Sequence, residues 1–326
     1  MNDHPKKKQR KNAAREMDFC LTISSPASFK NMCEVMDSIL KDFHFQVVKT
    51  DAFEGLKIRQ MDESHCALLS IRYSCQVEVR QKKLEAACEA GELADDNLDD
   101  PWSFCVNKKT WRQFMKQINN TAVLKICQYR YKDDKKKDKQ KNDLITILAN
   151  DDEHSGKHKY ECNTLDVDLD EIGEANEIES NTTIEIDLEE CKKFWRLCSS
   201  QDSETVRFRF LLPPFENMKD GVFHMSFSNE CGVSGSRMFH SKFVDDTLIA
   251  DFKSTVNEEE DYAGWKQTYN QEFPVKMLNT FTKNLEKEQR LTIAISPNNP
   301  LVINYNLGID QSFIRFWVAP KVEEEE

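Results

Sequence analysis

Basic side chains recur at helical spacing in a chain that is acidic overall. Lys109, Arg112 and Lys116 lie three and four residues apart, which places them on one face of a helix, beside Lys108. Further basic residues at such spacing are Lys192, Lys193, Arg196, Lys276 and Lys283. One such face alone is commonly a plain solvated surface. Several in a chain of net charge −12 predict a surface that follows phosphate groups without reading bases.

Residue patterns of the common enzyme sites are absent or weak. The sequence has no glycine-rich phosphate loop, no nucleophile elbow and no zinc-protease motif. His154 and His158 have i,i+4 spacing but lie in a polar loop. Asp62, Ser64 and His65 contain the groups of a hydrolase triad, yet sequence neighbours seldom form one, so a hydrogen-bonded turn is the stronger interpretation. We therefore predict no catalysis, metal or cofactor.

Composition predicts a soluble globular protein of about two domains, with 326 residues, 39% hydrophobic and 31% charged. No apolar run is long enough for a membrane span or a signal peptide, so we expect no membrane partner. Eleven cysteines contain no Cys-x-x-Cys pair. Cys33, Cys191 and Cys198 fall on apolar helical positions, which predicts reduced, buried thiols in an intracellular protein.

Four amphipathic helices are predicted to carry these residues, near 28–43, 106–118, 187–198 and 274–285. Each is preceded by one strand and followed by several short strands, and the helices begin about 80 residues apart. This internal repeat predicts an α+β protein with antiparallel sheets, helices on one face and two repeats per domain.

Charge patterns divide the chain into segments. We predict a basic disordered arm at 1–17, an N-terminal domain at 18–160, a connector at 161–181, a C-terminal domain at 182–320 and an acidic tail at 321–326. The arm could serve as a nuclear localisation signal or only as a solubilising tail. Acidic or lysine-rich insertions are expected at 85–100, 132–141 and 245–261.

Five motifs indicate a family when they are taken in chain order. They are QMDESHCAL at 60–68, LDVDLDEIG at 165–173, LNTFTK at 278–283, PLVINY at 300–305 and FWVAPKVE at 316–323. In these residues, and over nearly the whole chain from Phe19 onward, the sequence resembles the sliding clamps of the proliferating cell nuclear antigen family.

The resemblance implies a homotrimeric ring of two-domain protomers, with antiparallel sheets outside and helices lining a hole for duplex DNA. It implies a processivity factor in the nucleus, or in a viral replication site. Such a factor tethers DNA polymerase, a clamp loader and other replication and repair proteins without catalysis. By the resemblance and the helical spacing, the DNA-facing residues are Lys30, Lys41, Lys109, Arg112, Lys116, Lys193, Arg196, Lys276 and Lys283.

The resemblance also implies a pocket for short partner motifs and an interface between subunits. The pocket residues are Met61, Cys66, Leu68, Ile172, Pro300, Trp317, Ala319 and Pro320. The interface pairs the edge segment 157–161, including Tyr160, with segment 236–243 of the next subunit. Glu174 at the pocket rim predicts that partner motifs are flanked by basic residues.

Three alternatives stay open from the sequence. Trp317 and Pro300 could complete the core of the second domain. The chain could be one subunit of a heteromeric checkpoint-type clamp, or, in a different class, a nucleic-acid-processing enzyme.

Trp317 in place of a tyrosine, and Glu174-Ala175 after Gly173, depart from the family pattern and indicate a divergent clamp, from a large DNA virus or a protist.

Overall fold

The computed structural model describes residues 15–79, 102–131, 144–151, 156–165, 182–212, 220–244, 247–252, 266–286, 290–297 and 299–321. The predictions for residues 1–14, for the insertions at 85–100 and 132–141, for most of the connector and for the acidic tail beyond Lys321 fall outside these ranges.

Four helices are found close to their predicted places: α1 (Pro26–Ile39), α3 (Lys108–Gln117), α4 (Leu188–Ser200) and α6 (Val275–Thr282). The first ends at Ile39 rather than near 43, so Phe43 belongs to the following strand. Local signals fix where three of them begin. Pro26 starts α1, where a missing N–H costs nothing. The side chain of Asn107 accepts hydrogen bonds from the backbone N–H groups of Lys109 and Thr110 at the start of α3, and Asp187 caps α4 in the same way. None of the described helices is both long and apolar enough to cross a membrane.

Strands account for most of the rest of the described chain. In the N-terminal half they are β1 (Arg15–Ile23), β2 (Asp42–Lys49), β3 (Glu54–Met61), β4 (Ala67–Ser74), β5 (Gln76–Val79), β6 (Ser103–Asn107), β7 (Val123–Tyr131), β8 (Leu144–Asp151) and β9 (Gly156–Asn163). In the C-terminal half they are β10 (Thr182–Asp187), β11 (Thr205–Leu212), β12 (Asp220–Ser228), β13 (Ser234–Val244), β14 (Thr247–Phe252), β15 (Lys266–Pro274), β16 (Arg290–Ile295), β17 (Leu301–Asn306) and β18 (Phe313–Val318).

The two halves of the chain repeat one pairing scheme. In the N-terminal half, β1 before α1 pairs with β7 after α3, and β6 before α3 pairs with β2 after α1. In the C-terminal half, β10 pairs with β16 and β15 with β11 in the same crossed way. All of these pairs are antiparallel. The prediction of an α+β protein with antiparallel sheets is therefore confirmed.

A continuous sheet joins the halves. Strand β18 pairs antiparallel with β4, so the order β15-β11-β12-β13-β14-β10-β16-β17-β18-β4-β3-β2-β6 forms one thirteen-stranded sheet, and β5-β1-β7-β8-β9 forms a second. The helices also meet between the halves, because Ser38 Oγ donates to the carbonyl of Thr280 at 3.2 Å and Asn284 Nδ2 to that of Glu34 at 2.9 Å. The core lies between helices and sheets, where Phe281 of α6 stacks on Phe316 of β18 with ring centroids 4.5 Å apart.

The prediction of an acidic insertion at 245–261 is wrong for residues 247–252, which form strand β14. It pairs antiparallel with β13 and parallel with β10, and so links the two sheet segments of the C-terminal half. The short run TLIADF is flanked by acidic residues, which hid its strand character in the sequence.

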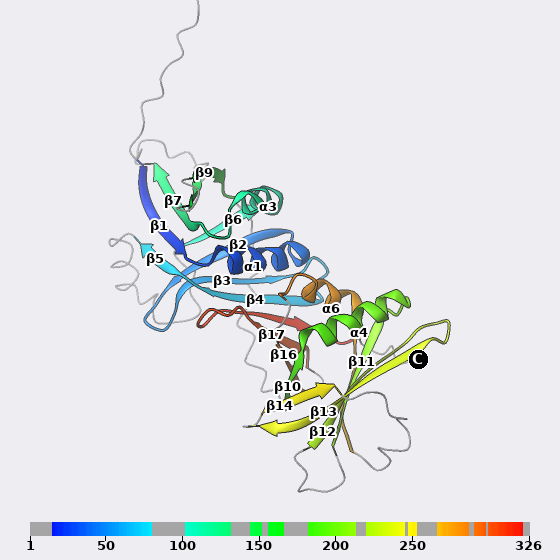
Figure 1. Ribbon diagram of the computed structural model, residues 1–326. Coiled ribbons are helices and arrows are strands. Elements are labelled where there is room, and N and C mark those ends of the chain that lie inside the picture. The colour runs from blue at the N-terminus through cyan, green and yellow to red at the C-terminus, as the bar shows by residue number, and fades with distance from the viewer. Residues whose placement is uncertain are drawn as a thin grey trace, which may run out of the picture.

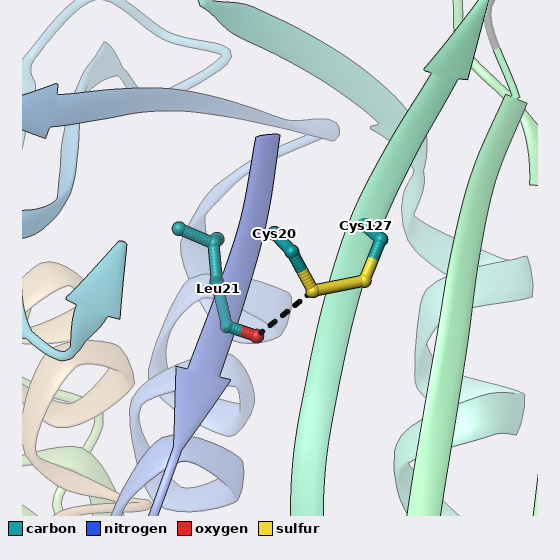
Figure 2. The surroundings of a disulfide bond; sticks show 3 residues. All are labelled: Cys20, Leu21 and Cys127. Atoms are coloured by element: carbon teal, nitrogen blue, oxygen red, sulfur yellow. Dashed lines mark hydrogen bonds between the residues drawn. A yellow bond between two sulfur atoms is a disulfide. The ribbon is translucent and has the colours of Figure 1, made fainter. Parts of the chain in front are cut away.

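Cysteine pairing differs in part from the sequence prediction. Cys33, Cys191 and Cys198 are buried free thiols, as predicted, and burial raises the pKa of Cys33 to about 12. Cys20 and Cys127, directly opposite each other on β1 and β7, form a disulfide, so the expectation of reduced thiols is wrong for this pair. Figure 2 shows the bridge, with Cys20 Sγ 4.0 Å from the carbonyl oxygen of Leu21. This is a contact only, because a disulfide sulfur has no proton to donate.

Candidate functional site

The four helices form a single row, which we call the helix row. Helix α1 contacts both α3 and α6, and α6 contacts α4. Figure 1 shows α3, α1, α6 and α4 following one another along one side of the molecule, with the sheets beside them. The basic residues that the sequence singled out for phosphate contact are therefore brought together from both halves of the chain.

Eight of the nine predicted DNA-facing cations are exposed on or next to this row. Six of them are Lys41, Lys109, Lys116, Arg196, Lys276 and Lys283. The other two form ion pairs: Arg112 lies 3.4 Å from Asp37 across α3 and α1, and Lys193 lies 2.7 Å from Glu190 one turn away on α4. Exposed pairs of this kind are worth little energy, so both cations can exchange partners with a phosphate.

Lys30 has a different role. Its Nζ donates to the backbone carbonyl of Ile118 at the end of α3, and at 2.9 Å to Asn120 Oδ1. Desolvation by burial lowers the pKa of this lysine. Lys30 therefore holds α1 against the end of α3, and we no longer count it among the free phosphate contacts.

Two more lysines of the basic faces donate to carbonyls at or just beyond the ends of neighbouring helices. Lys108 Nζ donates to the carbonyl of Leu40, after the last turn of α1, at 2.9 Å. Lys192 is buried on α4 and donates to the carbonyl of Leu285, just beyond α6, at 2.7 Å. The Leu40 carbonyl stands at the C-terminus of α1, where carbonyls lack an intrahelical donor and carry partial negative charge, so Lys108 supplies both a donor and a positive charge. The Leu285 carbonyl lies three residues beyond the last residue of α6, in the turn that follows it. The sequence placed Lys192 on a solvated basic face, and that placement is wrong.

The predicted partner pocket lies on the outward face of the thirteen-stranded sheet, opposite the core. Met61 pairs with Leu68, Leu68 with Trp317, and Trp317 with Val302, on the adjacent strands β3, β4, β18 and β17. We call these four residues the apolar row. Val302 was missed by the sequence analysis, because only the cross-strand register reveals that it adjoins Trp317.

Trp317 does not complete the core. Ile314, Phe316 and Val318 of β18 are buried and face the helices, whereas Phe313, Arg315 and Trp317 alternate with them and are only half-buried. The period of two along a strand puts these two sets on opposite faces. Trp317 thus lies on the outward face of the sheet, between Leu68 and Val302 in the apolar row.

A hydrogen-bonded turn shapes one side of this pocket. The Asp62 carboxylate accepts hydrogen bonds from the backbone N–H of Ala67 at 2.7 Å, from that of Ser64 at 3.1 Å and from the Ser64 hydroxyl. His65, with φ of 55°, and Cys66 are exposed at the tip of the turn. Asp62 and Ser64 are therefore occupied in building the turn, which agrees with its interpretation as structural.

Ala319 and Pro320 lie beside this turn, Pro300 lies at the start of β17, and Ile172 is not described. The backbone N–H of Ala319 donates to the carbonyl of Cys66 at 3.0 Å, which places Ala319 and the half-buried Pro320 beside the turn. Pro300 is half-buried and directly precedes β17. Ile172 lies outside the described residues. The start of the connector is described as far as Leu165, whose N–H donates to the carbonyl of Cys105 at 2.8 Å.

The predicted subunit interface contains two partly open strand edges. Among the described strands, β9 pairs only with β8, and residues 234–238 of β13 pair only with β12. These edges lie at opposite ends of the molecule (Figure 1). The predicted segment 236–243 requires correction, because Phe239–Phe243 pair with β14. Tyr160 stacks on Phe114 of α3 with ring centroids 5.1 Å apart, so its ring packs within the chain.

Within the described part of the chain, no cluster of three His, Cys, Asp or Glu side chains could hold a metal ion. His158 is exposed on β9 and stacks near Tyr160, while His154 lies outside the described residues. Comparison of the sequence with models of protein families finds none that matches.

Proposed function

We propose that the protein is a DNA sliding clamp, a ring of identical subunits that encircles duplex DNA and tethers DNA polymerase. The protomer has two clamp domains joined by the connector, and the helix row of each subunit faces the DNA. The clamp loader and other replication and repair proteins bind the same subunits through short motifs. The residues that track phosphates are Lys41, Lys109, Arg112, Lys116, Lys193, Arg196, Lys276 and Lys283.

The observation that carries this proposal is the continuous helix row, with exposed cations contributed by both repeated halves of the chain. Lysine and arginine side chains on this face attract DNA phosphates independently of the base sequence. Cations on such a face contact the phosphate backbone rather than base edges, so the contacts should be transient, which sliding requires.

Two further observations support the proposal. The apolar row lies on the outward face of the sheet, where Met61 and Trp317 are half-buried and Leu68 and Val302 are buried, so the anchors of a short partner motif would pack chiefly against Met61 and Trp317. Among the described strands, β9 and residues 234–238 of β13 each pair with a neighbouring strand on one side only, and head-to-tail ring closure joins two unlike edges of this kind.

A threading assay tests the topological part of the proposal without a loader. The protein is mixed with a linear duplex whose ends are open, the ends are then blocked with biotin and streptavidin, and the DNA is washed at high salt. A ring is retained on this DNA but not on a duplex whose ends were blocked beforehand. Equal retention on both would mean ordinary surface binding and would refute the clamp.

The basic face of the helix row is tested in the same assay with Arg196→Glu combined with Lys276→Glu. Binding to the open-ended duplex, measured at several salt concentrations before the ends are blocked, should weaken and its salt dependence should flatten, by a slope of about one for each cation that can no longer meet a phosphate. Lys125→Glu, on the sheet strand β7, is the matched control and should behave as the parent. Native mass measurement separates a homotrimer from a lone subunit of a heteromeric clamp, and nuclease assays with magnesium test the enzyme alternative.

A further inference from the structure

The sheet beside the apolar row carries a concentrated group of cations and aromatic rings. Reading across β3, β4 and β18, three successive rows are Lys57, Arg72 and Phe313; Arg59, Ser70 and Arg315; Met61, Leu68 and Trp317. The third row belongs to the apolar row already described. The first two place four cations next to it: Lys57, Arg59, Arg72 and Arg315, which we call the cationic sheet patch.

Aromatic rings hold two of these cations in place. The Arg72 guanidinium lies 5.7 Å from the Phe53 ring centroid and 5.8 Å from that of Phe313. The Arg315 guanidinium lies 5.0 Å from the centroid of Phe313 and 5.6 Å from that of Trp317. All four distances fall within the range of cation–π attraction. Arg315 is also oriented by Asn304, whose Oδ1 accepts from its Nε at 2.6 Å.

The charge of this surface is one-sided. The outward positions of β3 from Lys57 to Met61, and those of β4, β17 and β18 in the described chain, carry the four cations of the cationic sheet patch and no carboxylate. The whole chain has a net charge of −12. Asp42, on the adjacent strand β2, is the carboxylate nearest to Met61 on this face, and the four cations of the cationic sheet patch suit a ligand of negative charge.

We propose that the cationic sheet patch takes carboxylate side chains of the same partner segment whose apolar anchors fill the apolar row. The proposal rests on the proposed function, in that a partner motif occupies that row. Alternate residues of an extended chain lie about 7 Å apart and point to the same side. When an extended partner segment runs along β18 with its anchor over Trp317, the second residue from the anchor lies over Arg315. The fourth residue from the anchor lies over Phe313, next to Arg72.

Partners of this protein are accordingly expected to carry Asp or Glu at the second and fourth positions from an apolar anchor. This is the opposite sign from the basic flank that Glu174 predicts. A guanidinium held on aromatic rings loses little further freedom on binding, and its planar array of N–H donors matches a carboxylate.

A single-stranded nucleic acid is the other ligand that arginine and aromatic side chains commonly bind, because bases stack on open rings. Here guanidinium groups already lie over the rings of Phe313 and Trp317. The geometry therefore favours an acidic peptide.

The test uses three labelled peptides with identical apolar anchors and either Glu, Gln or Lys at the second and fourth positions. Their affinities for the full-length protein are measured by fluorescence anisotropy at low and high salt. The Glu peptide should bind about three- to tenfold more tightly than the Gln peptide, as expected for two exposed charge pairs. This difference should shrink as salt is added.

Two variants locate the effect. Arg72→Gln with Arg315→Gln should remove the preference for Glu. Because Arg315 touches Trp317, Lys57→Gln with Arg59→Gln provides a second variant, which leaves the stacked rings unchanged and should weaken the preference. Lys125→Gln, a cation on the other sheet, is the matched control and should keep the full preference.

The outcomes separate this inference from the proposed function. If no anchored peptide binds the parent protein, both the pocket and the cationic sheet patch are refuted. If all three peptides bind equally, or the variants keep the Glu preference, the pocket stands and the cationic sheet patch is refuted. Binding of a labelled single-stranded oligonucleotide that the Arg72→Gln, Arg315→Gln variant abolishes would assign the surface to nucleic acid instead.

Discussion

Replacing Lys192 and Lys193 in turn separates a structural lysine from a DNA-facing one on adjacent positions of α4. The side chain of Lys192 is 3% exposed, and that of Lys193 is 56% exposed. Lys192→Met keeps a side chain of similar length and apolar stem but removes the ammonium group. The carbonyl of Leu285 then loses its donor at 2.7 Å, and the carboxylate of Glu189 loses a cation at 3.5 Å.

The expected loss of stability follows from these interactions. A hydrogen bond from a charged donor is worth about 1.5–3 kcal/mol, and a buried acceptor left without a donor carries a further penalty. Burying the apolar methionine side chain offsets part of this, so we expect Lys192→Met to lower the free energy of unfolding by about 2 kcal/mol. Lys193→Met removes only an exposed pair with Glu190 and should cost about 0.5 kcal/mol or less.

Urea unfolding followed by tryptophan fluorescence measures both changes, because Trp195 is buried on the same helix. DNA binding supplies the converse readout: Lys193→Met should weaken binding to the open-ended duplex, measured before its ends are blocked, while Lys192→Met, assayed below its unfolding range, should not. Equal free energies of unfolding for the two variants would refute the assignment of Lys192 as a buried donor to the turn after α6.

Three further predictions concern other parts of the molecule. Burial lowers the pKa of His44 to about 4, below the 6.5 of an unfolded histidine. The free energy of unfolding should therefore fall as pH falls from 6.5 towards 4, because in this range only the unfolded chain takes up the proton. The loss should be up to about 1 kcal/mol per pH unit. His44→Gln should flatten this pH dependence in a series of urea-unfolding measurements. Cys20→Ala with Cys127→Ala should cost about 2–4 kcal/mol without reductant, and the difference from the parent should largely vanish once the parent is reduced. If the Phe114–Tyr160 stack holds β9 ready for assembly, Phe114→Ala and Tyr160→Ala should both favour monomers in sedimentation, whereas an effect of Tyr160→Ala alone would indicate that Tyr160 contacts the next subunit directly.

The sequence by itself determined the four helices and the repeat. Helix identity is a local property: an apolar stripe with a period of 3.6 residues selects the buried face, and capping residues such as Asn107 and Asp187 set the start. The helices therefore fell where the pattern put them. Most of the basic residues are exposed because they lie on the helix faces opposite these apolar stripes.

The clustering of the pocket residues was available from the sequence only through the family resemblance. Met61, Leu68 and Trp317 are far apart in the chain, and no local pattern relates β4 to β18. Register between strands is set by which faces are buried and by the turns, so it emerges only when the sheet forms. For the same reason Val302 and the cationic sheet patch were not found from the sequence.

Tertiary structure alone decided the roles of individual lysines and cysteines. Lys30, Lys108 and Lys192 each meet a carbonyl at or just beyond a helix end that lies 88, 68 and 93 residues away, respectively, so their spacing on their own helices could not distinguish them from phosphate-binding lysines. Cys20 and Cys127, separated by 107 residues, became partners only because β1 and β7 are neighbours. Side-chain type and periodicity fix which face a residue occupies, but the partner on that face comes from whichever distant segment packs against it.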